Sequence, residues 1–136
     1  MSIQVSQLVK QYGTQRAVDD ISFSIGRGEI VGFLGPNGAG KSTTMKMLTG
    51  YLRPDSGSAQ ISGINVIQDP IAARKKIGYL TELNALYYDM FVREYLLFIA
   101  ELQQVSPAKP AVEKVLQQTG LLAESHKQIA QLSKGY

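Results

Sequence analysis

The chain has 136 residues, enough for one domain with a hydrophobic core, and its 14 basic and 11 acidic residues give a net charge of +3. This positive excess is too small and too scattered to indicate a nucleic-acid-binding protein. The sequence has no cysteine and a single histidine, His126, so that disulfides, thiol chemistry and a metal site built from several histidines are excluded.

Two strands are expected at the start of the chain. Residues 3–9 alternate imperfectly between apolar and polar side chains, and residues 16–25 carry apolar residues at a similar spacing. A turn between them is predicted at Gly13, because glycine permits a positive φ. Asp19 and Asp20 interrupt the alternation of the second strand and indicate a bulge or bend.

A third strand, a glycine-rich loop and a helix follow in that order. Residues 29–34 form a nearly continuous apolar run, which is typical of a strand buried on both faces of a parallel sheet. Residues 35–43 read G-P-N-G-A-G-K-S-T, which fits the spacing G-x-x-x-x-G-K-S/T of a phosphate-binding loop. Residues 43–48 then read as an amphipathic helix that Gly50 ends.

The residue types in this loop suit a phosphate chain. Gly35, Gly38 and Gly40 let the backbone approach an anion closely, so that successive N–H groups and the helix N-terminus point at it. Lys41 supplies a positive charge for the β- and γ-phosphates, and the Ser42 hydroxyl is an oxygen ligand for Mg²⁺. The alternative is a glycine-rich structural turn, but such a turn does not require the Lys-Ser-Thr sequence that follows the glycines.

The rest of the chain changes from mixed to helical character. Asp69 followed by Pro70 indicates a helix N-cap and first turn, and that helix is expected to end near Lys75. The other predicted elements, in chain order, are a strand at 58–62, a strand at 77–80, a loop at 81–89, a helix at 92–102, a break at 106–110, a helix at 112–119 and a weakly helical stretch at 121–130.

These motifs resemble the ATP-binding subunit of ABC transporters, over essentially the whole chain. Pro36 and Asn37 are the residues that this family usually has inside the loop. The last five residues, L-S-K-G-Y at 132–136, are similar to the family signature L-S-G-G-Q, from which Lys134 and Tyr136 depart. The leading stretch and this pentapeptide most resemble bacterial exporter cassettes with separate membrane subunits, including cassettes associated with gliding motility. The other similar stretches are A-V-D-D-I-S-F-S-I-G-R-G-E-I-V-G-F-L-G at 17–35 and Y-L-R-P-D-S-G at 51–57.

The resemblance implies an α/β fold. This would be a P-loop NTPase core of the ABC ATPase type, with an N-terminal antiparallel β subdomain and a helical subdomain, in truncated form. Residues 1–136 would be a partial ABC ATP-binding domain. The β subdomain and P-loop core would occupy 1–90, and the helical subdomain 91–136, up to the signature.

The resemblance also implies an ATP site. Tyr12 would stack on the adenine, although an exposed tyrosine of a hairpin is the alternative. Ser133 and Gly135 would contact the γ-phosphate of ATP bound to a second cassette. The residues that would hold the phosphates are Gly35, Pro36, Asn37, Gly38, Ala39, Gly40, Lys41, Ser42 and Thr43.

Two residues are expected to bind Mg²⁺, Ser42 and Glu82. Glu82 stands where the family often has a glutamine that reaches the metal and the attacking water. Glutamate is a harder, charged ligand, and its position after the predicted strand at 77–80 favours a role in the site. An ordinary loop carboxylate is the alternative.

The resemblance implies two partners, a second ATP-binding subunit and a transmembrane permease subunit, and no nucleic acid. No apolar run approaches the ~20 residues of a membrane-spanning helix, so the expected location is cytoplasmic, peripheral to the inner membrane through the permease. Tyr87, Tyr88 and Phe91 would contact the permease or be buried in the local core.

The expected function is to couple ATP binding and hydrolysis to transport by a membrane partner. In this family the Asp-Glu pair and the histidine needed for hydrolysis follow the signature, and no such Asp-Glu pair occurs in the 136 residues. A chain without the strand that carries this Asp is expected to leave a gap in the sheet and exposed apolar edges. The alternatives are a fragment that binds ATP without hydrolysing it, a non-functional orphan fragment and a soluble ABC ATPase without a role in transport.

Overall fold

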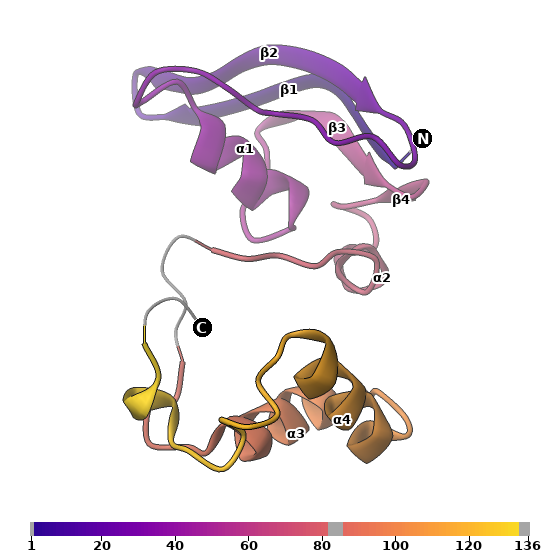
Figure 1. Cartoon of the computed structure of the whole chain (residues 1–136). Helices are drawn as coiled ribbons and strands as arrows, with labels where there is room; N and C mark the ends of the chain where they lie inside the picture. Colours follow the sequence, from indigo (N-terminus) through magenta and orange to yellow (C-terminus); the bar gives the residue numbers. More distant parts are fainter. Residues whose placement is uncertain (1, 82–85, 134–136) are drawn as a thin grey trace. The chain divides into compact units, whose positions relative to one another are not determined.

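The structure is a computed structural model that describes residues 2–81 and 86–133. The chain divides into two compact units, Met1–Leu80 and Thr81–Tyr136. The first unit contains all the strands of the described residues and two helices, and the second is helical (Figure 1). Each unit has its own hydrophobic core.

An antiparallel sheet of four strands, in the order β2-β1-β3-β4, forms one layer of the first unit. Strands β1 (Ile3–Tyr12) and β2 (Gln15–Ile25) form a hairpin whose turn contains Gly13 at a φ of 56°. Strands β3 (Ser56–Ile61) and β4 (Ile64–Asn65) complete the sheet. The predicted hairpin strands, the turn at Gly13 and the short strand near 58–62 are therefore confirmed.

The irregularity predicted at Asp19 and Asp20 is a bulge in β2. Leu8 of β1 pairs with Ile21 and Lys10 pairs with Val18, so that β2 has one residue more than β1 between these pairs. Asp20 has a φ of 49°, a value that few residues with a side chain adopt. The carboxylate interrupts the apolar alternation because it stands in this extra, exposed position.

Helix α1 (Lys41–Leu48) covers one face of the sheet and supplies large buried side chains to the core. Met47 and Leu48 pack against residues of β1, β2 and β3. Helix α2 (Pro70–Arg74) follows, and the Asp69 carboxylate accepts a hydrogen bond from the Ala72 N–H at 3.0 Å, as the N-cap prediction requires. The buried core residues are Val5, Leu8, Val18, Met47, Leu48, Ala59, Ile61, Val66 and Ala73.

The strands predicted at 29–34 and 77–80 are wrong for this structure, because neither segment belongs to a strand of the described residues. A parallel strand becomes buried only when other strands pair with it and helices cover both faces. Residues 2–81 and 86–133 supply no such neighbours for these segments, and Ile30 and Leu34 are 102% and 92% exposed. Apolar side chains of residues 29–34 are thus exposed, but they form no edge of the sheet, because the segment belongs to no strand of the described residues.

The second unit is built on two amphipathic helices that pack against each other, α3 (Val92–Leu102) and α4 (Ala108–Gln118). The helix predicted at 92–102 is confirmed. Helix α4 begins four residues earlier than expected, because Pro110 lies in its first turn, where the missing N–H and the fixed φ of proline are tolerated. The stretch predicted as weakly helical at 121–130 forms turns that lead into the 3₁₀ helix η1 (Ile129–Gln131).

The core of this unit is small and continuous. It consists of the buried residues Val92, Ala100, Val112, Leu116 and Ile129. Arg93 of α3 forms an ion pair with Glu113 of α4, and its guanidinium also donates to the Ser125 hydroxyl at 3.0 Å. Helices α3 and α4 have 11 residues each, and no helix in the described ranges has the length and apolar character needed to cross a membrane.

Candidate phosphate-binding site

The predicted phosphate-binding loop occupies the turn that leads into α1. The Ala39 N–H donates to the Pro36 carbonyl at 3.2 Å and closes the turn. Gly40 is the N-cap of α1 with a φ of 83°, in the left-handed region that favours glycine. Helix α1 begins at Lys41, two residues before the predicted start, so that Lys41, Ser42 and Thr43 form its first turn.

Gly40 lies directly against the neighbouring hairpin. A Cβ at this position would be 2.1 Å from the Ala17 carbonyl oxygen and 3.1 Å from Cγ2 of Val18, both in β2. Only a glycine permits this approach, because a Cβ is essentially never found so close to another heavy atom. The fixed glycine of the motif therefore seats the N-terminus of α1 on the sheet.

Lys41 folds back over the loop that precedes it. Its ammonium donates to the carbonyl oxygens of Gly35 at 2.6 Å and of Pro36 at 2.7 Å. The charge is thus held beside the loop by two backbone acceptors. An anion in this turn would offer the ammonium stronger, charge-assisted hydrogen bonds than two neutral carbonyls do.

The first turn of α1 presents N–H donors that have no partner within the described chain. The N–H groups of Lys41, Ser42 and Thr43 donate to no acceptor among residues 2–81 and 86–133. No acidic residue lies in this first turn, so the partial positive charge of the helix N-terminus is not compensated there. This turn therefore has three features that favour binding of a phosphate group: N–H donors without an acceptor among the described residues, a helix N-terminus and a lysine.

Thr44 is a residue of the site that sequence reasoning missed. It is buried, and its hydroxyl donates to the Gly40 carbonyl at 3.0 Å, beside the helical hydrogen bond from its own N–H at 2.8 Å. This pair of bonds fixes the glycine that seats the helix. The signal in the sequence is a hydroxyl residue four positions after the N-cap, which is weak because serine and threonine side chains bond to the carbonyl four residues earlier in many helices.

The hairpin places Tyr12 near the loop. Tyr12 ends β1 and is 52% exposed. Two positions earlier in β1, Lys10 pairs with Val18, which is one of the two residues that a Cβ at Gly40 would meet. Tyr12 therefore lies about 7 Å further along the strand than the point where the loop meets the sheet, at the strand rise of roughly 3.4 Å per residue.

The remaining predicted site residues lie in the second unit or outside the described ranges. Ser133 is exposed near the end of the second unit. Glu82, the predicted metal ligand, and Gly135, the second residue of the predicted signature contact, lie outside the residues that the structure describes, as do Lys134 and Tyr136.

The predicted partner-binding aromatic residues are at the surface of the second unit. Tyr87, Tyr88 and Phe91 are all about half exposed, which disfavours the alternative that they are buried in the core. The Tyr87 ring contacts Phe98 edge to face, with centroids 5.9 Å apart. Beside them is an open hollow of about 640 Å³, lined by Met90, Phe91, Arg93, Glu94, Leu97, Phe98, Glu101, Ser125 and His126.

Comparisons with known proteins agree with the resemblance seen in the sequence. The family model described as "ABC transporter" matches residues 18–136. The chain is 37% identical to the bacitracin transport ATP-binding protein BcrA of Bacillus licheniformis, over 98% of the chain and 43% of that protein. It is 36% identical to the linearmycin resistance ATP-binding protein LnrL of Bacillus subtilis (strain 168), again over 98% of the chain and 43% of the relative.

A solved structure titled "Structure of ATP binding subunit of ABC transporter" matches with a TM-score of 0.86 and 31% sequence identity, over 99% of the chain and 57% of that structure. The chain thus spans less than half of the length of the two curated relatives and somewhat more than half of the solved one. The match covers both of the units described above.

Proposed function

The chain belongs to the ABC transporter family, with the α/β fold of its ATP-binding subunit, and from this premise we propose that it binds ATP as part of a transporter ATPase. One observation carries the proposal. The first turn of α1 combines three N–H donors, free among the described residues, with the Lys41 ammonium, on a helix seated against the sheet by Gly40. That arrangement suits the polyphosphate of a nucleotide.

We propose the following roles for the site residues. Residues 35–43 hold the phosphates through backbone N–H groups, and Lys41 exchanges its two carbonyl acceptors for phosphate oxygens. Tyr12 stacks on the adenine, which its exposure permits. Ser133 and Gly135 contact the γ-phosphate held by a second cassette.

Mg²⁺ is the proposed metal, with Ser42 and Glu82 as its protein ligands. Held there, the ion would supply positive charge that neutralises the charge of the phosphates. Ser42 is exposed in the first turn of α1, where its hydroxyl is free to coordinate. The proposed coordination uses only two protein ligands, as is usual for Mg²⁺ that binds together with a nucleotide.

Members of this family are ATPases, and we propose that ATP turnover drives a membrane partner. The proposed partners are a second ATP-binding subunit and a permease, with the protein peripheral to the inner membrane on the cytoplasmic side. The exposed aromatic residues Tyr87, Tyr88 and Phe91, together with the adjoining hollow, support a protein contact on the second unit. We propose that the β subdomain and P-loop core extend over residues 1–90 and the helical subdomain over residues 91–136; the boundary between the two compact units, after Leu80, lies ten residues earlier.

For the 136 residues by themselves, ATP binding is the activity to test. Calorimetric titration with Mg-ATP is expected to show one saturable site per chain, and inorganic tripolyphosphate is expected to compete for it, because the phosphate chain provides most of the contacts. A chain that folds but binds neither ligand would contradict the proposal.

Replacement of Ser42 by alanine is expected to remove the dependence of ATP binding on Mg²⁺. The substitution deletes the proposed metal ligand and leaves the backbone N–H donors in place. ATP affinity without Mg²⁺ should therefore stay within about twofold of the original, while the gain on adding Mg²⁺ falls by about tenfold or more. Titrations in EDTA and in excess Mg²⁺ measure both quantities.

The matched control is Ser24→Ala, an exposed serine of β2. It should leave both affinities unchanged. If Ser42→Ala retained the full response to Mg²⁺, the assignment of Ser42 as a metal ligand would be wrong.

A further inference from the structure

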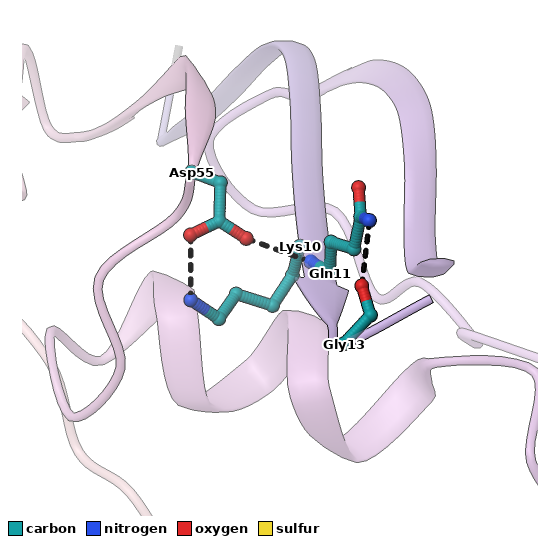
Figure 2. Close-up of polar contacts among 4 residues, drawn as sticks. All are labelled: Lys10, Gln11, Gly13 and Asp55. Carbon is teal, nitrogen blue, oxygen red and sulfur yellow. Dashed lines mark hydrogen bonds and ion pairs between the residues drawn. The ribbon is translucent and has the colours of Figure 1, made fainter. Parts of the chain in front are cut away.

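A charged cluster outside the phosphate-binding loop connects β1 to the segment that follows α1 (Figure 2). Asp55 lies in the loop between α1 and β3. Its carboxylate accepts hydrogen bonds from the Lys10 ammonium at 2.9 Å and from the Gln11 N–H at 2.7 Å. A backbone bond from the Asp55 N–H to the Val9 carbonyl at 2.9 Å aligns the loop with the strand. Both carboxylate oxygens are thus used to hold β1.

The same cluster fixes the backbone on both sides of Tyr12. The Gln11 N–H before it is bound by Asp55. The Gly13 carbonyl after it accepts a hydrogen bond from the Gln11 side chain at 2.7 Å, as Figure 2 shows. The Lys10 ammonium lies 5.7 Å from the centroid of the Tyr12 ring, within the range of a cation–π interaction.

Asp55 therefore connects two parts of the proposed ATP site, the phosphate-binding turn and the end of β1 that carries Tyr12. Helix α1 is seated on β2 at its N-terminus by Gly40, and Asp55 ties the chain that leaves α1 to β1. The phosphate-binding turn and Tyr12 belong to segments that are held together at these two points. A change at Asp55 would free the end of β1 without touching the loop of residues 35–43.

We propose that Asp55, acting with Lys10, is a positioning residue that holds Tyr12 at the place where it receives the base of the nucleotide. The inference rests on the proposed function, because it presumes that Tyr12 stacks on the adenine. The inference adds to the proposed function a link between the base-binding and phosphate-binding parts of the site, and the Asp55 carboxylate makes this link.

The ionisation of Asp55 agrees with this role. The hydrogen bond from the Gln11 N–H, followed by that from Lys10, holds the pKa of the Asp55 carboxyl below its usual range. The carboxylate is therefore fully charged at neutral pH. About half of this side chain is open to solvent, so its effect comes from the geometry of the hydrogen bonds more than from the strength of the ion pair.

The test compares two ligands that differ in the presence of a base. Dissociation constants for Mg-ATP and for Mg-tripolyphosphate are measured for the 136-residue chain and for Asp55→Asn. Loss of base stacking in Tyr12→Ala is expected to weaken ATP binding about tenfold and to leave tripolyphosphate binding within about twofold. Asp55→Asn is expected to weaken ATP binding about fivefold, again with tripolyphosphate unchanged.

The double variant Asp55→Asn with Tyr12→Ala should bind ATP no more weakly than Tyr12→Ala alone, because both act through the same ring. Lys10→Met gives a second, independent disruption with the same expected pattern. Asp19→Asn is the matched control: it removes the same charge from an exposed ion pair with Arg16 on the same hairpin, and it should change neither constant.

The outcomes separate the inference from the proposed function. If the unaltered chain bound neither ligand, the proposed function itself would fail. If it bound both, and Asp55→Asn weakened both equally, changed neither, or added fully to Tyr12→Ala, the positioning role of Asp55 would be overturned and phosphate binding would stand. The positioning role would also be overturned if Tyr12→Ala left ATP binding unchanged.

Discussion

Replacement of Lys41 by alanine is expected to weaken Mg-ATP binding by about 100-fold. Charge-assisted hydrogen bonds to phosphate oxygens contribute about 1.5–3 kcal/mol each. Without a nucleotide, the Lys41 ammonium already donates to the carbonyl oxygens of Gly35 and Pro36. Nucleotide binding therefore exchanges these two hydrogen bonds for stronger ones to phosphate oxygens. The net loss on truncation is therefore about 3 kcal/mol rather than twice that. Calorimetric titration measures it.

The matched control for Lys41 is Lys46→Ala in the last turn of the same helix. Both substitutions remove one positive charge from an exposed or half-buried position of α1, but Lys46 is more than one turn away from the loop. We expect Lys46→Ala to keep the affinity within about twofold. Equal losses in the two variants would show that general charge attraction, and no specific contact, holds the nucleotide.

Replacement of Gly40 by alanine is expected to lower the free energy of unfolding of the first unit by about 4 kcal/mol. The left-handed φ costs a residue with a Cβ about 1–2 kcal/mol. The new methyl group would also lie 2.1 Å from the Ala17 carbonyl oxygen, and relief of such an overlap in a packed region costs about 1–3 kcal/mol or more. Since α1 supplies Met47 and Leu48 to the core, displacement of the helix also loosens the core. Urea unfolding followed by hydrogen exchange of the sheet amides measures the loss.

Gly63→Ala separates the two causes. Gly63 has a φ of 81°, close to the 83° of Gly40, but no atom lies within 4 Å of its would-be Cβ. This variant should lose only the roughly 1–2 kcal/mol that the left-handed backbone costs. A loss in Gly40→Ala as small as that in Gly63→Ala would mean that the loop can move away from β2 at little cost.

The features that the sequence predicts correctly depend on neighbouring residues in the chain. The glycine spacing of the loop, the turn at Gly13 and the N-cap at Asp69 each satisfy local backbone geometry, and the structure has all three. Apolar periodicity also indicates α1 and α3. Such local patterns predict an element correctly when its formation does not depend on residues that are distant in the sequence.

The errors and omissions mostly concern contacts between distant segments. Residues 29–34 have the composition of a buried strand, but a strand forms only where at least one neighbouring strand pairs with it, and composition does not supply that neighbour. The link between Lys10 and Asp55 joins residues 45 positions apart, and no spacing rule indicates it. The start of α4 is a local error, because a proline in a first turn and a proline in a break look alike in the sequence.

The unpaired segment at 29–34 has a thermodynamic consequence for ligand binding. At its C-terminal end the phosphate-binding loop is anchored by Gly40 and α1. At its N-terminal end two contacts hold the preceding segment: the Phe33 ring lies 5.6 Å from the Phe23 ring, and the Gly26 N–H donates to the Glu29 carboxylate. Because few contacts hold this segment, we expect its local opening to cost little free energy and its amides to exchange with solvent faster than those of β1. A nucleotide that binds to the loop must then order residues 29–34, and part of the binding free energy is lost as conformational entropy of this segment. Any neighbour that paired with this segment would raise nucleotide affinity without touching the nucleotide.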